Sequence, residues 1–318
     1  MAVLLVFIFT YLSKKVGLID IPNTRKPHAG EIPLIGGLVI VSSYFLSIKT
    51  FNVTTNVIDE IILGTFLVSF FGLLDDLKPR HWSLRVFAQL VASVYIIHST
   101  EISINHIASV GYFNIHIPEI ASYVLTLIAI LGITNAINLL DGIDGLASGI
   151  IVFPLLIFLF VVDNNFIPII LILLINVLVF LKFNLGKLKQ KIFLGDAGSL
   201  GIGFFLGWLL IVLSNKNFIL PEYVIWIVAI PILDTFGVMY RRYSAGLKIF
   251  EPDNRHIHHI LIKNGYTSKV TLQIILISSI VINLLGLYIV NTFPQYSYFC
   301  FILVALIYYY LLSRFQRL

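Results

Sequence analysis

Five of the ten aspartates could form a functional site in a chain that otherwise has the composition of a lipid-soluble protein: Asp75, Asp76, Asp141, Asp144 and Asp196. Of its 318 residues, 58% are hydrophobic and only 12% are charged, and the mean hydropathy is +0.97. Carboxylates in or beside a bilayer are costly, so they are rare there and usually functional. Several of them gathered on one face predict a functional site.

Four polar residues recur at a spacing of three: Asn135, Asn138, Asp141 and Asp144. Positions three apart share a face of a helix, so the spacing predicts a polar stripe of two amides and two carboxylates. The glycine after each aspartate would leave room for a ligand beside that stripe. Polar contacts between helices usually use one such residue, so the stripe favours ligand binding.

Asp75 and Asp76 end an apolar run, at what would be the negative C-terminal pole of a helix. Two carboxylates there repel each other unless a cation or a shared proton relieves the charge. A divalent ion would do this more completely than Lys78 or Arg80. The alternative is a solvated pair of loop residues.

Asp196 lies in the sequence Gly-Asp-Ala-Gly-Ser, which follows a basic stretch and opens the next apolar run. Backbone N–H groups and the positive dipole at a helix N-terminus favour phosphate. A carboxylate at this place suits a site for a metal and a diphosphate. The alternative is a helix cap with glycines in the turn.

A second polar cluster, Arg255, His256, His258 and His259, follows Asp234 in the chain. Zinc normally takes imidazole or thiolate ligands, whereas acid-rich sites around phosphates suit magnesium. We therefore expect the arginine and histidines to contact phosphate and the aspartates to hold magnesium. Asp234 either joins this site or forms a hydrogen bond inside the helical bundle.

A basic loop at residues 23–28 ends in His28 and precedes Gly36 and Gly37. It is either an anion-binding entrance, where the glycines permit close backbone approach, or an anchor that fixes the topology.

The elements that must position these residues are apolar runs of near-membrane length. One all-α transmembrane domain over residues 1–318, a polytopic bundle of about 11 helices, explains the pattern best, because about 20 residues cross a bilayer as a helix. The run 84–98 is the clearest candidate for a buried or re-entrant helix instead. The runs are 2–13, 33–48, 57–74, 84–98, 119–139, 146–162, 166–183, 199–214, 219–239, 270–291 and 295–313.

Basic residues predict the orientation. Numbering the loops alternately assigns 19 of the 21 lysines and arginines to one side and only Lys49 and Lys216 to the other. By the positive-inside rule, the N-terminus faces outward, while the C-terminus and the polar loops face the cytoplasm. The net charge of +5 then reflects topology and contact with anionic lipid or phosphate, without any nucleic-acid patch. Residues 2–13 lack the features of a signal peptide, and the single Cys300 excludes an intramolecular disulfide.

These motifs resemble the polyprenyl-phosphate N-acetylhexosamine-1-phosphate transferases, an integral-membrane superfamily. The Asp-Asp pair, the Asn-x-x-Asn-x-x-Asp-Gly-x-Asp-Gly run, Gly-Asp-x-Gly-Ser and the His-x-His-His loop occur in the family order, over residues 17 to 265. The sequences after Pro231 and Pro252 are similar to the WecA/TagO-like branch. The MraY branch usually has three consecutive histidines, which this chain lacks.

The resemblance implies transfer of a sugar-1-phosphate from a UDP-N-acetylhexosamine to undecaprenyl phosphate, with release of UMP and a need for Mg²⁺, with Mn²⁺ as a possible substitute. It implies that Asp196 is a magnesium ligand, with Asp75 and Asp76 close to the metal and the lipid phosphate. The remaining residues would contact the nucleotide sugar or its diphosphate: Asn135, Asn138, Asp141, Asp144, Asn184, Phe193, Arg255, His256, His258, His259 and His28. Phe193 would stack on uracil, and Asp144 and Asn184 would lie near the uridine.

Three other classes fit less well. A cation-coupled transporter would carry its acids near the membrane midplane rather than at helix ends. An MraY-type phospho-MurNAc-pentapeptide transferase is disfavoured by the histidine loop, and the Asp-Gly-x-x-Ala-Arg run of CDP-alcohol phosphotransferases is absent. The choice among GlcNAc, GalNAc, FucNAc and QuiNAc donors stays open, as does the polysaccharide that the product starts. The superfamily resemblance also implies a homodimer in a bacterial inner membrane.

Overall fold

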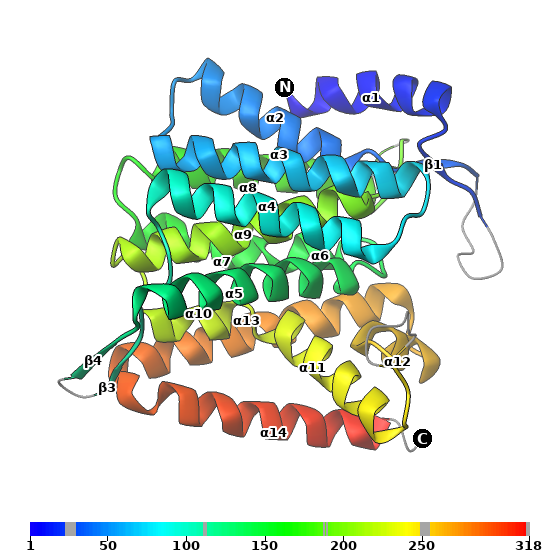
Figure 1. Cartoon of the computed structure of the whole chain (residues 1–318). Coiled ribbons are helices and arrows are strands. Elements are labelled where there is room, and N and C mark those ends of the chain that lie inside the picture. The colour runs from blue at the N-terminus through cyan, green and yellow to red at the C-terminus, as the bar shows by residue number, and fades with distance from the viewer. Residues whose placement is uncertain (23–29, 111–112, 187, 189, 249–254, 316–318) are drawn as a thin grey trace.

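The computed structural model describes residues 1–22, 30–110, 113–186, 188, 190–248 and 255–315. Its long helices run side by side in one bundle (Figure 1). Six segments of this described part are long and apolar enough to cross a membrane: α3 (Asn56–Leu77), α5 (Glu119–Leu140), α8 (Ile167–Asn184), α9 (Gly195–Asn215), α13 (Ser268–Thr292), and the short helix η1 (Pro294–Tyr296) continued by α14 (Ser297–Phe315). The chain is therefore an all-α, multi-pass membrane protein.

The number of spans stays a prediction. Every predicted apolar run overlaps a helix or a pair of helices, but α1 (Ala2–Val16) and α2 (Gly36–Thr50) each have only 15 residues. The run 84–98 forms α4 (Trp82–Thr100), which is not among the six candidate spans. A seventh span results if α10 (Pro221–Ile227) and α11 (Ala229–Ser244) are counted as one bent unit.

Two apolar runs that the sequence predicted as continuous helices are broken. The first divides into α6 (Leu146–Ile150) and α7 (Val152–Val161), and the second bends by 67° between α10 and α11. Pro154 and Pro231 each lie four residues beyond the last residue of the preceding helix. A proline has no N–H to donate to the carbonyl four residues back, and its ring clashes there, so the helix breaks.

Helix α9 forms the centre of the bundle, and its apolar window is entirely buried. It packs against α2, α3 and α5. Close approach depends on glycine where α2 crosses α9, because a Cβ on Gly37 would lie 2.2 Å from the backbone nitrogen of Gly198. Small residues at such crossings favour helix association in membranes.

Two short antiparallel ribbons, which the sequence reasoning did not predict, cap the bundle. Strands β1 (Ile19–Asp20) and β2 (Ile32–Pro33) pair at the end where α12 (Ile257–Lys263) lies. Strands β3 (His106–Val110) and β4 (Phe113–His116) pair at the opposite end (Figure 1). Ladders this short leave little of the alternating pattern by which strands are predicted.

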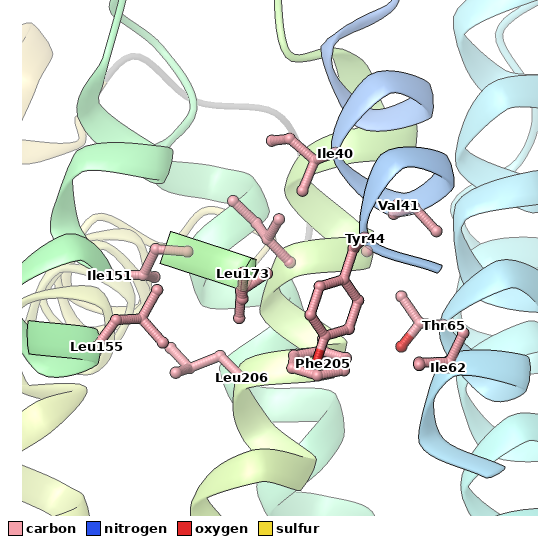
Figure 2. Close-up of a pocket in the computed structure, with 12 residues that line it drawn as sticks. Ile40, Val41, Tyr44, Ile62, Thr65, Ile151, Leu155, Leu173, Phe205 and Leu206 are labelled. Carbon is pink, nitrogen blue, oxygen red and sulfur yellow. The ribbon is translucent and has the colours of Figure 1, made fainter. Parts of the chain in front are cut away.

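A small cavity lies within the bundle between α2, α3, α7, α8 and α9 (Figure 2). Its volume of about 20 Å³ is room for about one water molecule. Tyr44 and Phe205 meet edge to face in its wall, with ring centroids 5.1 Å apart, and the other lining side chains are nearly all aliphatic. This cavity has no charged group to bind a phosphate or a sugar, so the functional site must lie elsewhere.

Candidate active site

The end of α3 and the start of α9 are joined by Asp76. Its Oδ1 accepts the N–H of Asp196 at 2.8 Å, and its Oδ2 accepts the N–H of Ala197 at 3.0 Å. These N–H groups belong to the first turn of α9, where no intrahelical acceptor is available. Gly195, at φ +73°, permits the contact, because a Cβ there would lie 2.6 Å from Asp76 Oδ2. The structure thus brings two separately predicted motifs together.

Arg85, in the first turn of α4, lies between the two remaining carboxylates. Its Nη1 is 3.1 Å from Asp75 Oδ2 and also contacts Asp196 Oδ2. The other oxygen of Asp75 accepts the Arg80 N–H at 2.6 Å, which fixes the connection between α3 and α4. Sequence reasoning counted Arg85 only as a topology marker, because nothing in the local pattern distinguishes it from the other lysines and arginines of its loop.

Asn138 ties α5 to the same cluster. Its Nδ2 donates to Asp196 Oδ1 at 3.0 Å and to Ser199 Oγ at 2.8 Å. Asn135, one turn earlier, instead donates to Gln89 Oε1 on α4 at 2.8 Å. The first two residues of the predicted stripe therefore bind different helices, Asn135 binding α4 and Asn138 binding α9.

The predicted four-residue stripe was wrong beyond Asn138. Helix α5 ends at Leu140, half-buried Asp141 is its C-cap, and Asp144 lies in the turn that follows. Helix α5 ends before both of the glycines that follow these aspartates, and Gly145, at φ +78°, is the N-cap of α6.

The turn after α5 is held against the segment that precedes α9. Asn184 is buried at the end of α8; its Oδ1 accepts the Gly145 N–H at 2.6 Å, and its Nδ2 donates to the Ile192 carbonyl at 2.9 Å. Lys191 Nζ lies 2.6 Å from Asp144 Oδ2 and 5.1 Å from the centroid of the Phe193 ring. Sequence reasoning linked Asn184, Asp144 and Phe193 to one ligand but missed Lys191.

The histidine segment is anchored by Asp234 on α11, which is fully buried. Asp234 Oδ2 lies 2.7 Å from His256 Nδ1, and Oδ1 accepts the N–H of Ile257 at 2.8 Å. The carboxylate thereby satisfies the N-terminus of α12, where a negative charge is favourable. Of the two predicted alternatives for Asp234, the structure shows a hydrogen bond inside the bundle, and this bond fixes the orientation of the His256 ring.

His258 packs under the turn after α5. It is 1% exposed, and a Cβ on Gly142 would lie 2.0 Å from its Nε2. Neither ring nitrogen has a hydrogen-bond partner among the described residues. Burial, together with the neighbouring His259 and His256 rings, lowers the pKa of His258 from 6.5 to about 3. His258 is therefore neutral in the substrate-free protein.

The remaining predicted residues are placed as follows. The His259 ring is half-buried, 4.1 Å from that of His258 between centroids, and the Arg255 carbonyl accepts a hydrogen bond from Arg241 Nη2 at 2.8 Å. His28 lies outside the described residues. All the other predicted site residues come from helix ends and loops at the end of the bundle that carries α12 (Figure 1).

The carboxylates of the acidic cluster are candidate ligands for a metal ion. Within the described part of the chain, no three acidic, histidine or cysteine groups are arranged to hold a metal ion. Magnesium, however, commonly takes only one or two carboxylates and completes its coordination with substrate phosphates and water. Asp75 and Asp196, which Arg85 bridges, fit that donor set, whereas both oxygens of Asp76 accept backbone N–H groups.

Comparison with known proteins adds the following findings. A family model described as "Glycosyl transferase family 4" matches residues 58–214. A protein of Escherichia coli O157:H7 named undecaprenyl-phosphate alpha-N-acetylglucosaminyl 1-phosphate transferase is 32% identical, over 97% of this chain and 89% of its own length. A Yersinia pestis protein of the same name is 31% identical over 88% and 79%. A Bacillus subtilis protein, named as a probable undecaprenyl-phosphate N-acetylglucosaminyl 1-phosphate transferase, is 32% identical over 82% and 74%.

Proposed function

The chain belongs to glycosyl transferase family 4, and we propose that it transfers N-acetylglucosamine-1-phosphate from UDP-GlcNAc to undecaprenyl phosphate. A lipid-phosphate oxygen forms a bond to the phosphorus that carries the sugar, the bond from that phosphorus to the UMP oxygen breaks, and UMP leaves. The observation that carries this proposal is the similarity to named transferases over nearly the whole chain. The product is the lipid-linked sugar that starts a cell-surface polysaccharide.

The position of the polar cluster supports this reaction. A polyprenyl acceptor stays in the bilayer and a nucleotide sugar stays in water, so the reacting groups must meet at the membrane surface. The cluster lies at the ends of apolar helices, at one end of the bundle. This position also argues against the transporter alternative, which expects acids near the midplane.

The contacts suggest a division of labour among the residues. Asp75 and Asp196 would hold a cation, and that cation together with Arg85, which lies between the two carboxylates, would receive the phosphate groups. Asp144 and Phe193 would hold the uridine, while Asn138 and Asp141 at the end of α5 would lie between the two regions. His256, oriented by Asp234, would reach the diphosphate together with Arg255 and His259.

We propose magnesium as the cofactor, with manganese as a substitute. Asp75 and Asp196 would hold the ion. When bound, it would neutralise charge on the two phosphate substrates and on the leaving UMP. Arg85 lies close enough to both carboxylates to reduce their mutual repulsion before the ion arrives.

The basic residues support a location in the bacterial cytoplasmic membrane, with the polar cluster facing the cytoplasm, the C-terminus on the same side and the N-terminus outside. A homodimer stays a prediction from the resemblance.

The test is a donor panel with purified protein, undecaprenyl phosphate and magnesium. UDP-GlcNAc should release UMP faster than UDP-GalNAc, and UDP-MurNAc-pentapeptide should be inert. One phosphoanhydride replaces another, so added UMP should drive the reverse reaction. Release of UMP only with UDP-MurNAc-pentapeptide would support the MraY-type alternative, and no UMP release with any donor would contradict the transferase assignment.

A further inference from the structure

Lys191 contacts both of the residues proposed to hold the uridine. Its ammonium lies 2.6 Å from Asp144 Oδ2 and 5.1 Å from the Phe193 ring centroid. One cation thus serves both as a hydrogen-bond donor to the carboxylate and as a partner for the aromatic ring.

The backbone around this contact is held independently of Lys191. Asn184, 4% exposed, links the Gly145 N–H on one side to the Ile192 carbonyl on the other. Asp144 and Phe193 each adjoin one of these linked residues, so their relative position does not depend on the ion pair. The lysine side chain is flexible, and the pair is about one-third exposed, so the ammonium can leave without unfolding the pocket.

A ligand that replaces the ammonium must supply the same two features, an N–H for an acceptor-only carboxylate and a group that packs on an aromatic ring. A uracil ring has both, since its N3–H is a donor and its face is planar. We propose that Lys191 occupies the place of the uracil base in the nucleotide-free enzyme and is displaced when the base binds. This inference rests on the proposed function, because it assumes a uridine nucleotide as the ligand.

The competition has a predictable size. Loss of a partly exposed ion pair together with a cation–π contact changes the affinity for the base by about two- to thirtyfold. Lys191→Met keeps an unbranched side chain of similar length and removes the charge, so it should bind uridine more tightly by this factor.

The experiment measures uridine affinity by calorimetry in detergent for the wild type, Lys191→Met, Lys191→Arg and Lys216→Met. Uridine has no phosphate, so contacts of the freed ammonium with phosphates do not enter. Lys191→Arg should keep the wild-type affinity because it keeps a cation. Lys216 is the matched control, because its Nζ lies 5.5 Å from the Phe166 ring at the opposite end of the bundle.

Salt gives a second readout that a merely structural lysine would not change. Raising the ionic strength screens the Lys191–Asp144 pair, so uridine should bind the wild type more tightly at high salt and Lys191→Met with little change. Equal or weaker uridine binding by Lys191→Met overturns the proposal, and so does a complete absence of uridine binding in all four proteins. UMP release from UDP-GlcNAc is measured separately and tests the proposed transferase function. Its outcome does not depend on whether Lys191 occupies the uracil site.

Discussion

Neighbouring aspartates of this protein make different contacts, and their chemistry follows from those contacts. Asp76 uses both oxygens to accept backbone N–H groups of α9, whereas Asp75 and Asp196 both contact the guanidinium of Arg85. A carboxylate whose acceptors are occupied by the backbone positions a helix. A carboxylate whose partner is a side-chain cation can exchange that partner for a metal ion.

Asp196→Asn should therefore reduce transfer by at least about a hundredfold, because the variant lacks the charge that a metal ion needs. The amide is nearly the same size as the carboxylate, so membrane insertion and thermal stability should change little. UMP release by the purified variant is the measurement.

The control for this substitution is Asp163→Asn. Asp163 lies in the turn between α7 and α8, where it accepts the N–H groups of Asn165 and Phe166. The Asp163→Asn variant should retain full transfer. Wild-type turnover by Asp196→Asn would contradict its assignment as a metal ligand.

At the scale of elements, the turn after α5 connects the two halves of the site. Asn138 on α5 reaches Asp196 on α9, and Gly142 in the turn covers His258 on α12. The acidic cluster and the histidine segment thus meet at the same helix end. A shift of this turn should affect both.

Gly142→Ala tests this connection. The added Cβ would lie 2.0 Å from His258 Nε2, so the turn or α12 must move. Displacement of reacting groups by about 1 Å costs about a hundredfold in rate, and we expect a loss of UMP release of that order. Gly132→Ala, within α5, should be active because its Cβ would meet nothing within 4 Å. Full activity in Gly142→Ala would show that this contact does not position the site.

The buried His258 also makes stability depend on pH. Its pKa of about 3 lies below the ordinary value of 6.5, so as pH falls below 6.5 the unfolded chain takes up a proton before the folded protein does. The free energy of unfolding should therefore decrease toward lower pH, by up to about 1.4 kcal/mol per pH unit between 6.5 and 3.

Thermal unfolding of the wild type and His258→Leu at pH 7, 6 and 5 measures this effect. The leucine variant should lose less stability between pH 7 and 5, and the matched variant of the exposed His98, His98→Leu, should behave as the wild type. Identical pH profiles for all three proteins would be evidence against the buried, neutral state of His258.

Much of this arrangement could be predicted from sequence, and the failures have physical causes. Asp76 and Asp196 were predicted to share a site because each borders an apolar run, and this pattern is visible in the sequence alone. Arg85 and Lys191 were missed because each pairs with an aspartate more than 40 positions away in the chain, Asp196 and Asp144 respectively. The breaks near Pro154 and Pro231 could have been predicted, since a proline within an apolar run interrupts helical hydrogen bonding.

At the scale of the whole molecule, the helices alternate in direction, so residues from distant segments meet at one end of the bundle while Lys49 and Lys216 lie near the other. The side on which the polar end lies in a cell decides whether the enzyme can meet a cytoplasmic nucleotide sugar. Because the basic residues concentrate at that end, we expect it to face the cytoplasm.

Cysteine labelling tests this orientation, since Cys300→Ser provides a background free of cysteine. Lys78→Cys changes the loop next to Asp75, and Lys49→Cys changes the exposed end of α2 at the opposite pole. In spheroplasts with an intact inner membrane, an impermeant maleimide should label Lys49→Cys and should label Lys78→Cys only after lysis. Cys300→Ser alone should remain unlabelled in both conditions. The reverse pattern would place the carboxylates outside the cell, away from any pool of UDP-sugar. It would contradict both the predicted orientation and the transferase assignment.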